Sequence, residues 1–166
     1  MSKTLWRIAA DTPDYGADDN TGAGAEKSGG RWNRKGTPAV YCSETTAMAV
    51  LETIVHFKAG SLPLNRYLVQ IKVPESAWRL ATVWTPSTLK DAGKVAWDAL
   101  PAGRDSIDYG NDWLIGKTSP LLLVVPSVIV PHERNIVINP KHPAANTIVY
   151  TKLQKWIYDA RCKFDV

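Results

Sequence analysis

A strand that leads directly into a helix is encoded by the stretch PAVYCSETTAMAVLETIVHFKAG, residues 38–60. Its first five residues are apolar or aromatic, which favours a short buried strand. Ser43 is a residue typical of helix N-caps, and apolar residues then recur at helical spacing as far as about Ala59. We therefore predict a strand over residues 38–42 that ends at Ser43 and a helix that runs on to Ala59.

The two faces of this helix differ in composition. A stripe that would pack on the core holds Ala47, Val50, Leu51 and Ile54, and the other side holds Thr45, Ala49, Glu52 and His56. Glu52 and His56 are four residues apart, so a helix makes them neighbours. Small residues beside an acid and a histidine leave room for a ligand, although a solvated surface has the same composition.

The remaining elements follow from the same patterns. Asp11–Gly30 is rich in Gly, Asp, Asn and Ala and predicts a long loop. Strands are expected at Leu5–Ala9, Arg66–Val73, Leu80–Trp84, Leu121–Val125, Val128–Val130, Ile136–Ile138 and Thr147–Tyr150, and helices at Thr88–Leu100 and Ile107–Lys117. We predict an α+β fold in which strands dominate and three or four helices accompany them.

The length of 166 residues and an apolar fraction of 45% predict one globular domain over residues 1–166. No apolar run approaches the ~20 residues of a membrane span, and the N-terminus lacks the apolar core of a signal peptide. The two cysteines and three histidines are scattered, so we expect reduced thiols, a cytoplasmic location and no metal site.

The charge is mildly basic, with 20 Lys+Arg against 16 Asp+Glu and a net charge of +4. This excess permits attraction to an anion, but it is not the dense basic stripe that nucleic-acid binding favours. Seven tryptophans are many for this length, and we expect most of them in the core.

The first candidate site is GGRWN at residues 29–33. Gly30 permits close approach of a ligand to the backbone, and Arg31 offers a planar fork that suits phosphate. Trp32 sits beside it and is a candidate for lining the same site. The pattern is equally that of a glycine turn with a solvated arginine and a packed tryptophan.

Other candidates lie farther along the chain. Tyr41 could stack on a planar heterocycle, although strand aromatics usually pack in the core. Glu52 is either a solvated helix residue or a functional acid, with His56 as its neighbour. Ser127, between two apolar segments, either bonds backbone or points into a site. Its rival is Ser119, and Asn135 is of interest only if it is buried. The chain has no phosphate loop, dinucleotide fingerprint or nucleophile elbow.

Taken together and in order, these motifs resemble the RES domain, a family named after an Arg, a Glu and a Ser. The resemblance runs from about Leu5 to Asp165. It is carried by GGRWN at 29–33, TPAVY at 37–41, the helix around Glu52, VPS at 125–127 and NIVINP at 135–140.

The resemblance implies a fold similar to ADP-ribosyltransferases, with a strand-rich core split around an NAD cleft. It also implies the toxin half of a bacterial toxin–antitoxin pair that degrades NAD as substrate, with no bound cofactor. The expected partner is an Xre-like antitoxin with a helix-turn-helix domain, through which any DNA contact would be made. Some relatives instead ADP-ribosylate a protein target.

Carried over by motif, the resemblance implies catalytic roles for Arg31, Tyr41, Glu52 and Ser127, with Ser119 left as the rival serine. Gly30, Trp32, His56, Ser119 and Asn135 are the expected substrate-binding residues. The Ser-Thr-Ser strand and C-terminal Glu common among ADP-ribosyltransferases are absent from the sequence. Two other readings stay open: a non-catalytic nucleotide-binding or nucleic-acid-binding module, and an RNA-cleaving toxin that uses Glu52 and His56.

Overall fold

A seven-stranded sheet forms the centre of the computed structural model, which describes residues 1–57, 63–86 and 96–162. The strands are ordered β4-β5-β6-β2-β1-β3-β7, and of these neighbours β4 and β5 are parallel while the others are antiparallel. Their bounds are β1 (Ser2–Ala10), β2 (Val40–Ser43), β3 (Arg66–Pro74), β4 (Thr82–Val83), β5 (Leu122–Pro126), β6 (Arg134–Ile138) and β7 (Val149–Lys155).

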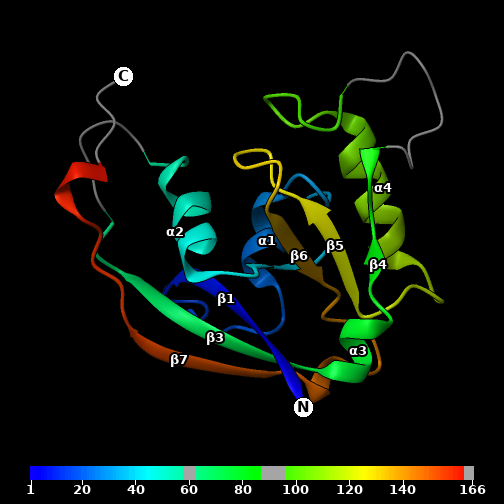
Figure 1. Ribbon diagram of the computed structural model, residues 1–166, viewed down its shortest axis with the longest axis horizontal. Helices are drawn as coiled ribbons and strands as arrows, with labels where there is room; N and C mark the ends of the chain where they lie inside the picture. Colours follow the sequence, from blue (N-terminus) through cyan, green and yellow to red (C-terminus); the bar gives the residue numbers. More distant parts are fainter. Residues whose placement is uncertain (58–62, 87–95, 163–166) are drawn as a thin grey trace.

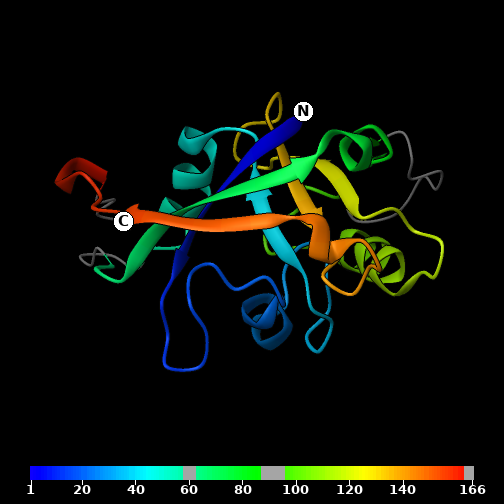
Figure 2. The ribbon, with the colours of Figure 1, turned by 90° about the horizontal axis from the view of Figure 1, so that it is seen from below.

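The sheet divides into two parts where β1 meets β2. β1 pairs with β3 along its whole length, and β3 pairs with β7, whereas β1 meets β2 at the single pair Trp6 and Ser43. The long strands β1, β3 and β7 lie together in Figure 2, and β2, β6 and β5 form the other part. Ser43 therefore lies at the joint between the two parts.

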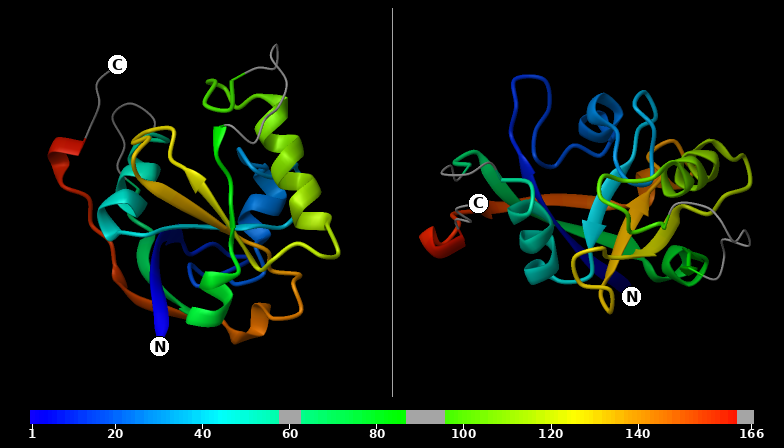
Figure 3. Two further views of the ribbon diagram at one scale, coloured as in Figure 1. Left: turned by 45° about the vertical axis from the view of Figure 1, so that its right-hand side comes forward. Right: turned by 90° about the horizontal axis from the view of Figure 1, so that it is seen from above.

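The helices are α1 (Ala23–Ser28), α2 (Thr46–Ile54), α3 (Glu75–Arg79) and α4 (Arg104–Ile115), with 3-10 turns η2 (Ala145–Thr147) and η3 (Ala160–Cys162). α2 buries Ala49 and Ile54 against Ile8 of β1 and Leu68 of β3. α4 buries Trp113 and Leu114 in a second cluster that includes residues of β5 and β6. The two helices flank β5 and β6 in Figures 1 and 3, one over each part of the sheet. The predicted α+β fold with dominant strands is confirmed.

The opposite face of the sheet carries the largest apolar cluster. Side chains alternate between faces along a strand, so Val124, Ile136 and Cys42 point to this face while Val125, Val137 and Tyr41 point to the other. The cluster is closed by Ala17 from the segment after β1 and Ile148 from the segment before β7, together with neighbouring apolar side chains. The face with α2 and α4 is consequently the one that presents polar side chains at the strand ends.

Most tryptophans are in or against the core, as expected. Trp32 is 3% exposed and Trp84 is 2% exposed, with ring centroids 4.9 Å apart in an edge-to-face arrangement. Trp97 stacks on Trp32 at 6.5 Å, and Tyr109 of α4 contacts both buried rings. This cluster anchors α4 and the segment around Trp97 to β5 and β6.

Several element boundaries differ from the predictions. The expected loop Asp11–Gly30 contains α1, which the Gly-Ala-rich sequence does not signal. Residues 128–130 form bends rather than a strand, because the hydroxyl of Ser127 accepts the backbone N–H groups of Ile129 and Val130. In the predicted helix 88–100, residues 88–95 lie outside the described part and residues 96–100 form a turn.

Smaller differences concern element ends. The expected strands Leu80–Trp84 and Thr147–Tyr150 are β4 and β7, which start at Thr82 and Val149. The helix expected at Ile107–Lys117 is α4, and it begins three residues earlier, at Arg104.

The helix predicted from Ser43 is α2, and it is shorter and differently oriented. Its N-cap is Thr45, whose side chain accepts a hydrogen bond from the N–H of Met48, and the helix ends at Ile54. The expected end at Ala59 lies outside the described residues. Ala47 is exposed, whereas Met48 and Ala49 are buried, so the predicted core stripe is wrong by about one position at its start. Among the described residues, no helix is long and apolar enough to cross a membrane.

Candidate functional site

The carboxylate of Glu52, on the last turns of α2, reaches the ends of β5 and β6. Ser127, the first residue after β5, donates its hydroxyl to Oε1 of Glu52 at 2.9 Å. Asn135 of β6 donates from Nδ2 to the same oxygen. Segments about 80 residues apart in the sequence thus meet at one carboxylate oxygen. Three of the predicted residues, Glu52, Ser127 and Asn135, are thus joined by direct hydrogen bonds.

Ser127 is fully buried and uses all of its hydrogen-bonding capacity. Its Oγ accepts the backbone N–H groups of Ile129 and Val130 at 3.1 and 3.2 Å, and its own N–H donates to the carbonyl of Glu133 at 2.9 Å. Because a hydroxyl has one proton and two lone pairs, the proton is left for Glu52. The serine therefore closes the turn after β5 and holds the carboxylate at once.

Asn135 is held from the other side by Ser43. The hydroxyl of Ser43 donates to Oδ1 of Asn135 at 2.6 Å, and the two residues are directly opposite each other in the antiparallel pairing of β2 and β6. Opposite residues of such a pair point to the same face of the sheet. The prediction that Ser43 caps the helix is wrong, since Thr45 does so; Ser43 instead extends the network around Glu52.

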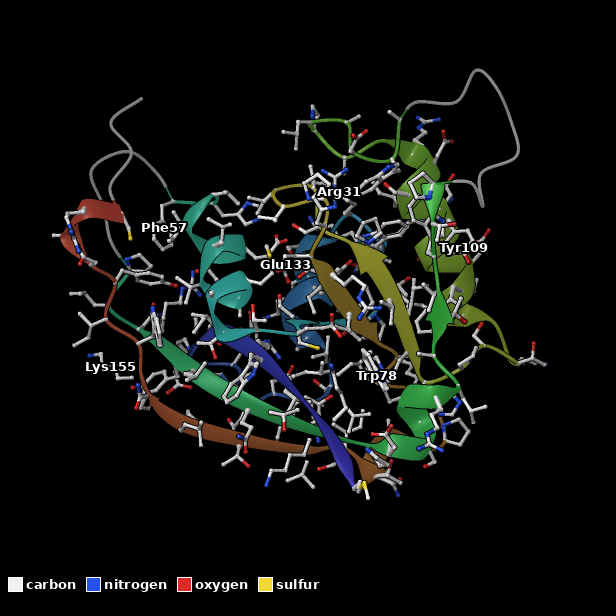
Figure 4. All side chains as sticks on the ribbon, viewed as in Figure 1. Arg31, Phe57, Trp78, Tyr109, Glu133 and Lys155 are labelled. Carbon is white, nitrogen blue, oxygen red and sulfur yellow. The ribbon has the colours of Figure 1, made fainter. Side chains whose placement is uncertain are left out.

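Arg31 lies between α2 and α4 in the view of Figure 4, near the upper end of β5. Its Nη1 donates to the backbone carbonyls of Trp97 and Ala99 at 2.6 and 3.0 Å. Burial lowers the pKa of the Arg31 guanidinium, and the negative charges of Asp98 and Glu52 partly offset that effect. Arg31 is thus close enough to Glu52 for their charges to interact.

Tyr41 and Gly30 fix the loop that carries Arg31. The hydroxyl of Tyr41 accepts the N–H of Trp32 at 3.0 Å and donates to Oδ1 of Asn33 at 2.8 Å. A Cβ on Gly30 would lie 2.8 Å from that hydroxyl, so only glycine fits there. Burial raises the pKa of Tyr41 well above its usual range, which keeps the phenol neutral.

Asn33 was missed by sequence reasoning and is a main anchor of this loop. It is 1% exposed, and its Nδ2 donates to the carbonyls of Ala25, Arg34 and Thr37. Its position as the last residue of the GGRWN motif could have indicated this role. Trp32 from the same motif points into the aromatic core cluster, where α4 approaches so closely that a Cβ on Gly110 would lie 2.2 Å from the Trp32 carbonyl oxygen.

Ser119 lies apart from this arrangement, and among the described residues no hydrogen bond joins the His56 side chain to it. His56 is exposed in the turn after α2, where its N–H bonds to the carbonyl of Thr53. α2 ends at Ile54, so His56 lies in the turn that follows the helix and not within it, and its proximity to Glu52 stays a prediction. Ser119 precedes β5 while Ser127 follows it, so the two serines lie at opposite ends of that strand. Ser127 is the one that reaches Glu52.

A hollow of about 390 Å³ lies at the other end of the sheet, against the C-terminus of α4. Its lining includes Thr37, Lys117, Asn139 and Lys141, and it includes none of the residues around Glu52. The two lysines lie where the carbonyl end of a helix attracts positive charge. Within the described part of the chain, no three His, Cys, Asp or Glu side chains are grouped as metal ligands.

The fold and the site define a single-sheet α+β protein in which an arginine loop, a helix glutamate and a strand-end serine lie together. The RES domain family model matches residues 4–161. The chain therefore belongs to the RES domain family, and it is a RES domain toxin.

The relatives agree with this assignment. The chain is 52% identical to the Prs ADP-ribosylating toxin of Sphingobium sp. strain YBL2 over 97% of both chains. It is 37% identical to the toxin Res of Yersinia enterocolitica, over 80% of this chain and 82% of that one. The fold is similar to a chain in the crystal structure of the M. tuberculosis MbcT–MbcA toxin–antitoxin complex. The TM-score is 0.54 at 17% identity, over 92% of this chain and 85% of that chain.

Proposed function

We propose that this RES domain toxin cleaves NAD at the bond between nicotinamide and ribose. The observation that carries the proposal is the carboxylate of Glu52, which two donors hold through one oxygen and whose charge interacts with that of Arg31. An anion fixed in place beside a cation suits a substrate that develops positive charge at one atom and carries negative charge at another.

The reaction passes through an oxocarbenium-like transition state, as other glycosidic cleavages do. Nicotinamide is cationic in NAD and leaves as a neutral base with the bonding electron pair, so no general acid is required. The positive charge that develops on the ribose ring is offset by Glu52. Its carboxylate is preorganised because Ser127 and Asn135 hold it before the substrate arrives.

Arg31 is suited to the anionic part of the dinucleotide. Its Nη1 is occupied by the carbonyls of Trp97 and Ala99, and no hydrogen bond from its Nε or Nη2 is found among the described residues. Those nitrogens are the edge of the guanidinium that a pyrophosphate would use. Tyr41 contributes by holding the loop, since its hydroxyl is occupied by Trp32 and Asn33.

The acceptor of the ADP-ribosyl group is water, phosphate or a protein side chain. Water would make the protein a glycohydrolase and phosphate a phosphorylase. Transfer to a protein is the second candidate, because the Sphingobium relative with 52% identity is named for ADP-ribosylating Prs.

Release of nicotinamide from NAD is the experiment that tests the proposal. Protein freed of any partner is incubated with NAD in buffers with and without phosphate, and nicotinamide is measured by chromatography. Labelled NAD with candidate proteins reports transfer in the same assay. If the wild-type protein releases no nicotinamide under any of these conditions, the proposal fails. A salt-sensitive shift with RNA or DNA would then favour the non-catalytic binding module.

We also propose that an antitoxin neutralises the protein and that it is of the Xre-like helix-turn-helix type. Support comes from the fold similarity to a chain of the MbcT–MbcA toxin–antitoxin complex and from the net charge of +4, which suits an acidic partner surface. Co-expression with the product of a neighbouring helix-turn-helix gene tests this. A stable complex that releases no nicotinamide is expected, and separate elution of the two chains would contradict it.

A further inference from the structure

We propose that Asn135 and Ser43 are positioning residues that act on the reaction through Glu52. They hold Oε1 of the carboxylate in one place and thereby direct its other oxygen, Oε2, to the substrate. The inference rests on the proposed function, because it assigns a role in NAD cleavage to residues behind the reacting group.

The sheet register fixes where these side chains meet. Asn135 is opposite Ser43 in β2 on one side and opposite Val125 in β5 on the other. Two residues farther along the chain from Val125, Ser127 leaves the strand on the same side as Asn135. The three polar side chains are therefore set by backbone hydrogen bonds of neighbouring strands, while Glu52 reaches them from a helix.

The direction of every hydrogen bond in this chain of groups is determined. A carboxylate only accepts, so Nδ2 of Asn135 must face Glu52 and Oδ1 must face Ser43. Ser43 must then donate its proton to Oδ1. Ser127, whose lone pairs already accept two backbone N–H groups, must donate to Glu52. Each donor and acceptor in the network can thus be assigned in only one way, and both final donors, Asn135 and Ser127, bind the same oxygen of Glu52.

The two oxygens of Glu52 are consequently unequal. Oε1 receives both donors, whereas no hydrogen bond to Oε2 is found among the described residues. Ser43 is 2% exposed and its hydroxyl is turned to Asn135, so it is placed to orient the amide rather than to touch a ligand. Removal of Ser43's hydroxyl would leave Oδ1 of Asn135 without its donor, so the contact with Glu52 alone would hold the amide and its position would be less fixed.

Four variants test the proposal by separating kcat from KM. Ser43→Ala is expected to lower kcat for nicotinamide release about 10-fold and Asn135→Ala about 100-fold, the scale of a misplaced catalytic group. KM for NAD should stay close to wild type. The melting temperature should fall, because each alanine removes a hydrogen bond of a buried polar group, but the variants should remain folded at the assay temperature, as circular dichroism can verify. Ser43→Thr keeps the hydroxyl and should restore most of the rate. Asn135→Asp keeps the size and accepts from Ser43, but it replaces the amide donor with a second carboxyl group against Glu52, so it should be at least as slow as Asn135→Ala at a pH where both carboxyls are ionised.

The double variant Ser43→Ala with Asn135→Ala makes the test decisive. If Ser43 acts through Asn135, the double variant is as slow as Asn135→Ala alone. Losses that multiply, a change in KM alone, or unchanged kcat in Asn135→Asp would overturn the inference while leaving the proposed function standing. Absence of release from the wild type would overturn both.

An NMR measurement detects the contacts of the Asn135 amide with Glu52 and Ser43 without requiring catalysis. The side-chain amide protons of Asn135 should shift in the NMR spectrum on Glu52→Gln and on Ser43→Ala. Glu133→Gln, a change to a nearby carboxylate outside the network, should leave them in place. If the chemical shifts of these amide protons do not change in Glu52→Gln and Ser43→Ala, the network is not formed and the inference is overturned.

Discussion

The hydroxyl of Ser127 donates to Glu52 across 2.9 Å, although Ser127 directly follows a strand and Glu52 lies on a helix 75 positions earlier. The contact ties α2, over one part of the sheet, to β5 in the other part. It also fixes the position of the Glu52 carboxylate before any substrate binds, because two backbone N–H groups hold the serine hydroxyl in place.

Glu52→Gln should abolish most NAD cleavage while the fold remains. Glutamine keeps the volume and an oxygen that accepts from Ser127, but it removes the charge that offsets the transition state. A loss of about 10²–10³-fold in kcat is expected. Nicotinamide release measures it, with Glu133→Gln as the matched control, which should keep its activity. Equal activity of the two variants would remove Glu52 from the mechanism.

Ser127→Ala should lower both stability and activity, whereas Ser119→Ala should change neither. The alanine leaves the partly buried N–H groups of Ile129 and Val130 without their acceptor, at a cost of about 1 kcal/mol in unfolding free energy. Urea unfolding and nicotinamide release are measured for both variants. If Ser119→Ala were the more damaging, the assignment of the functional serine would be reversed.

Arg31→Lys should weaken substrate binding even though it keeps the charge. A lysine ammonium lacks the planar fork, and its three donors share one nitrogen, so it cannot bond the carbonyls of Trp97 and Ala99 and also present a parallel pair of donors to an anion. KM for NAD should rise about 10-fold or more, and backbone amides near Trp97 should exchange hydrogen faster. The surface variant Arg161→Lys is the control. Unchanged KM with unchanged exchange would contradict the assigned role.

Gly110→Ala should unfold or strongly destabilise the protein. An added Cβ would lie 2.2 Å from the carbonyl oxygen of Trp32, which is backbone and cannot move aside. We expect a loss above about 2 kcal/mol. Gly24→Ala in α1 is the matched control, since its Cβ would meet the end of a tyrosine side chain at 3.3 Å, and a change below about 1 kcal/mol is expected. Thermal unfolding of the two variants gives the comparison.

Cys42 should make the protein less stable in alkali. Burial raises the pKa of the Cys42 thiol to about 12, while the unfolded chain ionises near pH ~8.5. The thiol is neutral in the folded state over this interval, so only the unfolded state gains from losing the proton. Stability should therefore fall as pH rises above ~8.5, by up to about 1.4 kcal/mol per pH unit from this group.

The measurement is the unfolding free energy between pH 7 and pH 10. Cys42→Ala should show a smaller decline than the wild type, although it is less stable at pH 7. In the folded wild type, iodoacetamide should modify the half-buried Cys162 and spare Cys42. An identical pH slope in both proteins would show that the buried thiol does not contribute.

The strands were the most predictable part of the fold. Alternating apolar residues from Arg66 to Val73 identify β3 nearly to the residue, because one face of that strand is buried. α1 was not predictable, since its short glycine-containing sequence is equally typical of a loop. The orientation of α2 was misjudged at Ala47 and Ala49, because alanine fits a buried and an exposed face alike.

The residues of the site could be predicted from the sequence, but the hydrogen bonds between them could not. The family motif supplied Arg31, Glu52 and Ser127, and the structure brings the last two into contact. Ser43 could not be assigned its role, because its bond to Asn135 spans 92 positions and depends on which strands pair and in what register. Sequence periodicity carries no information on such pairing.

The single pairing of β1 with β2 has a mechanical consequence. Ser43 pairs with Trp6 at the place where the two parts of the sheet are joined. It is also the first donor in the series of hydrogen bonds that runs through Asn135 to Glu52. A twist of one part against the other would therefore move the hydroxyl that orients the carboxylate. A ligand or partner that binds across β1 and β2 would therefore change the position of the Glu52 carboxylate without entering the site.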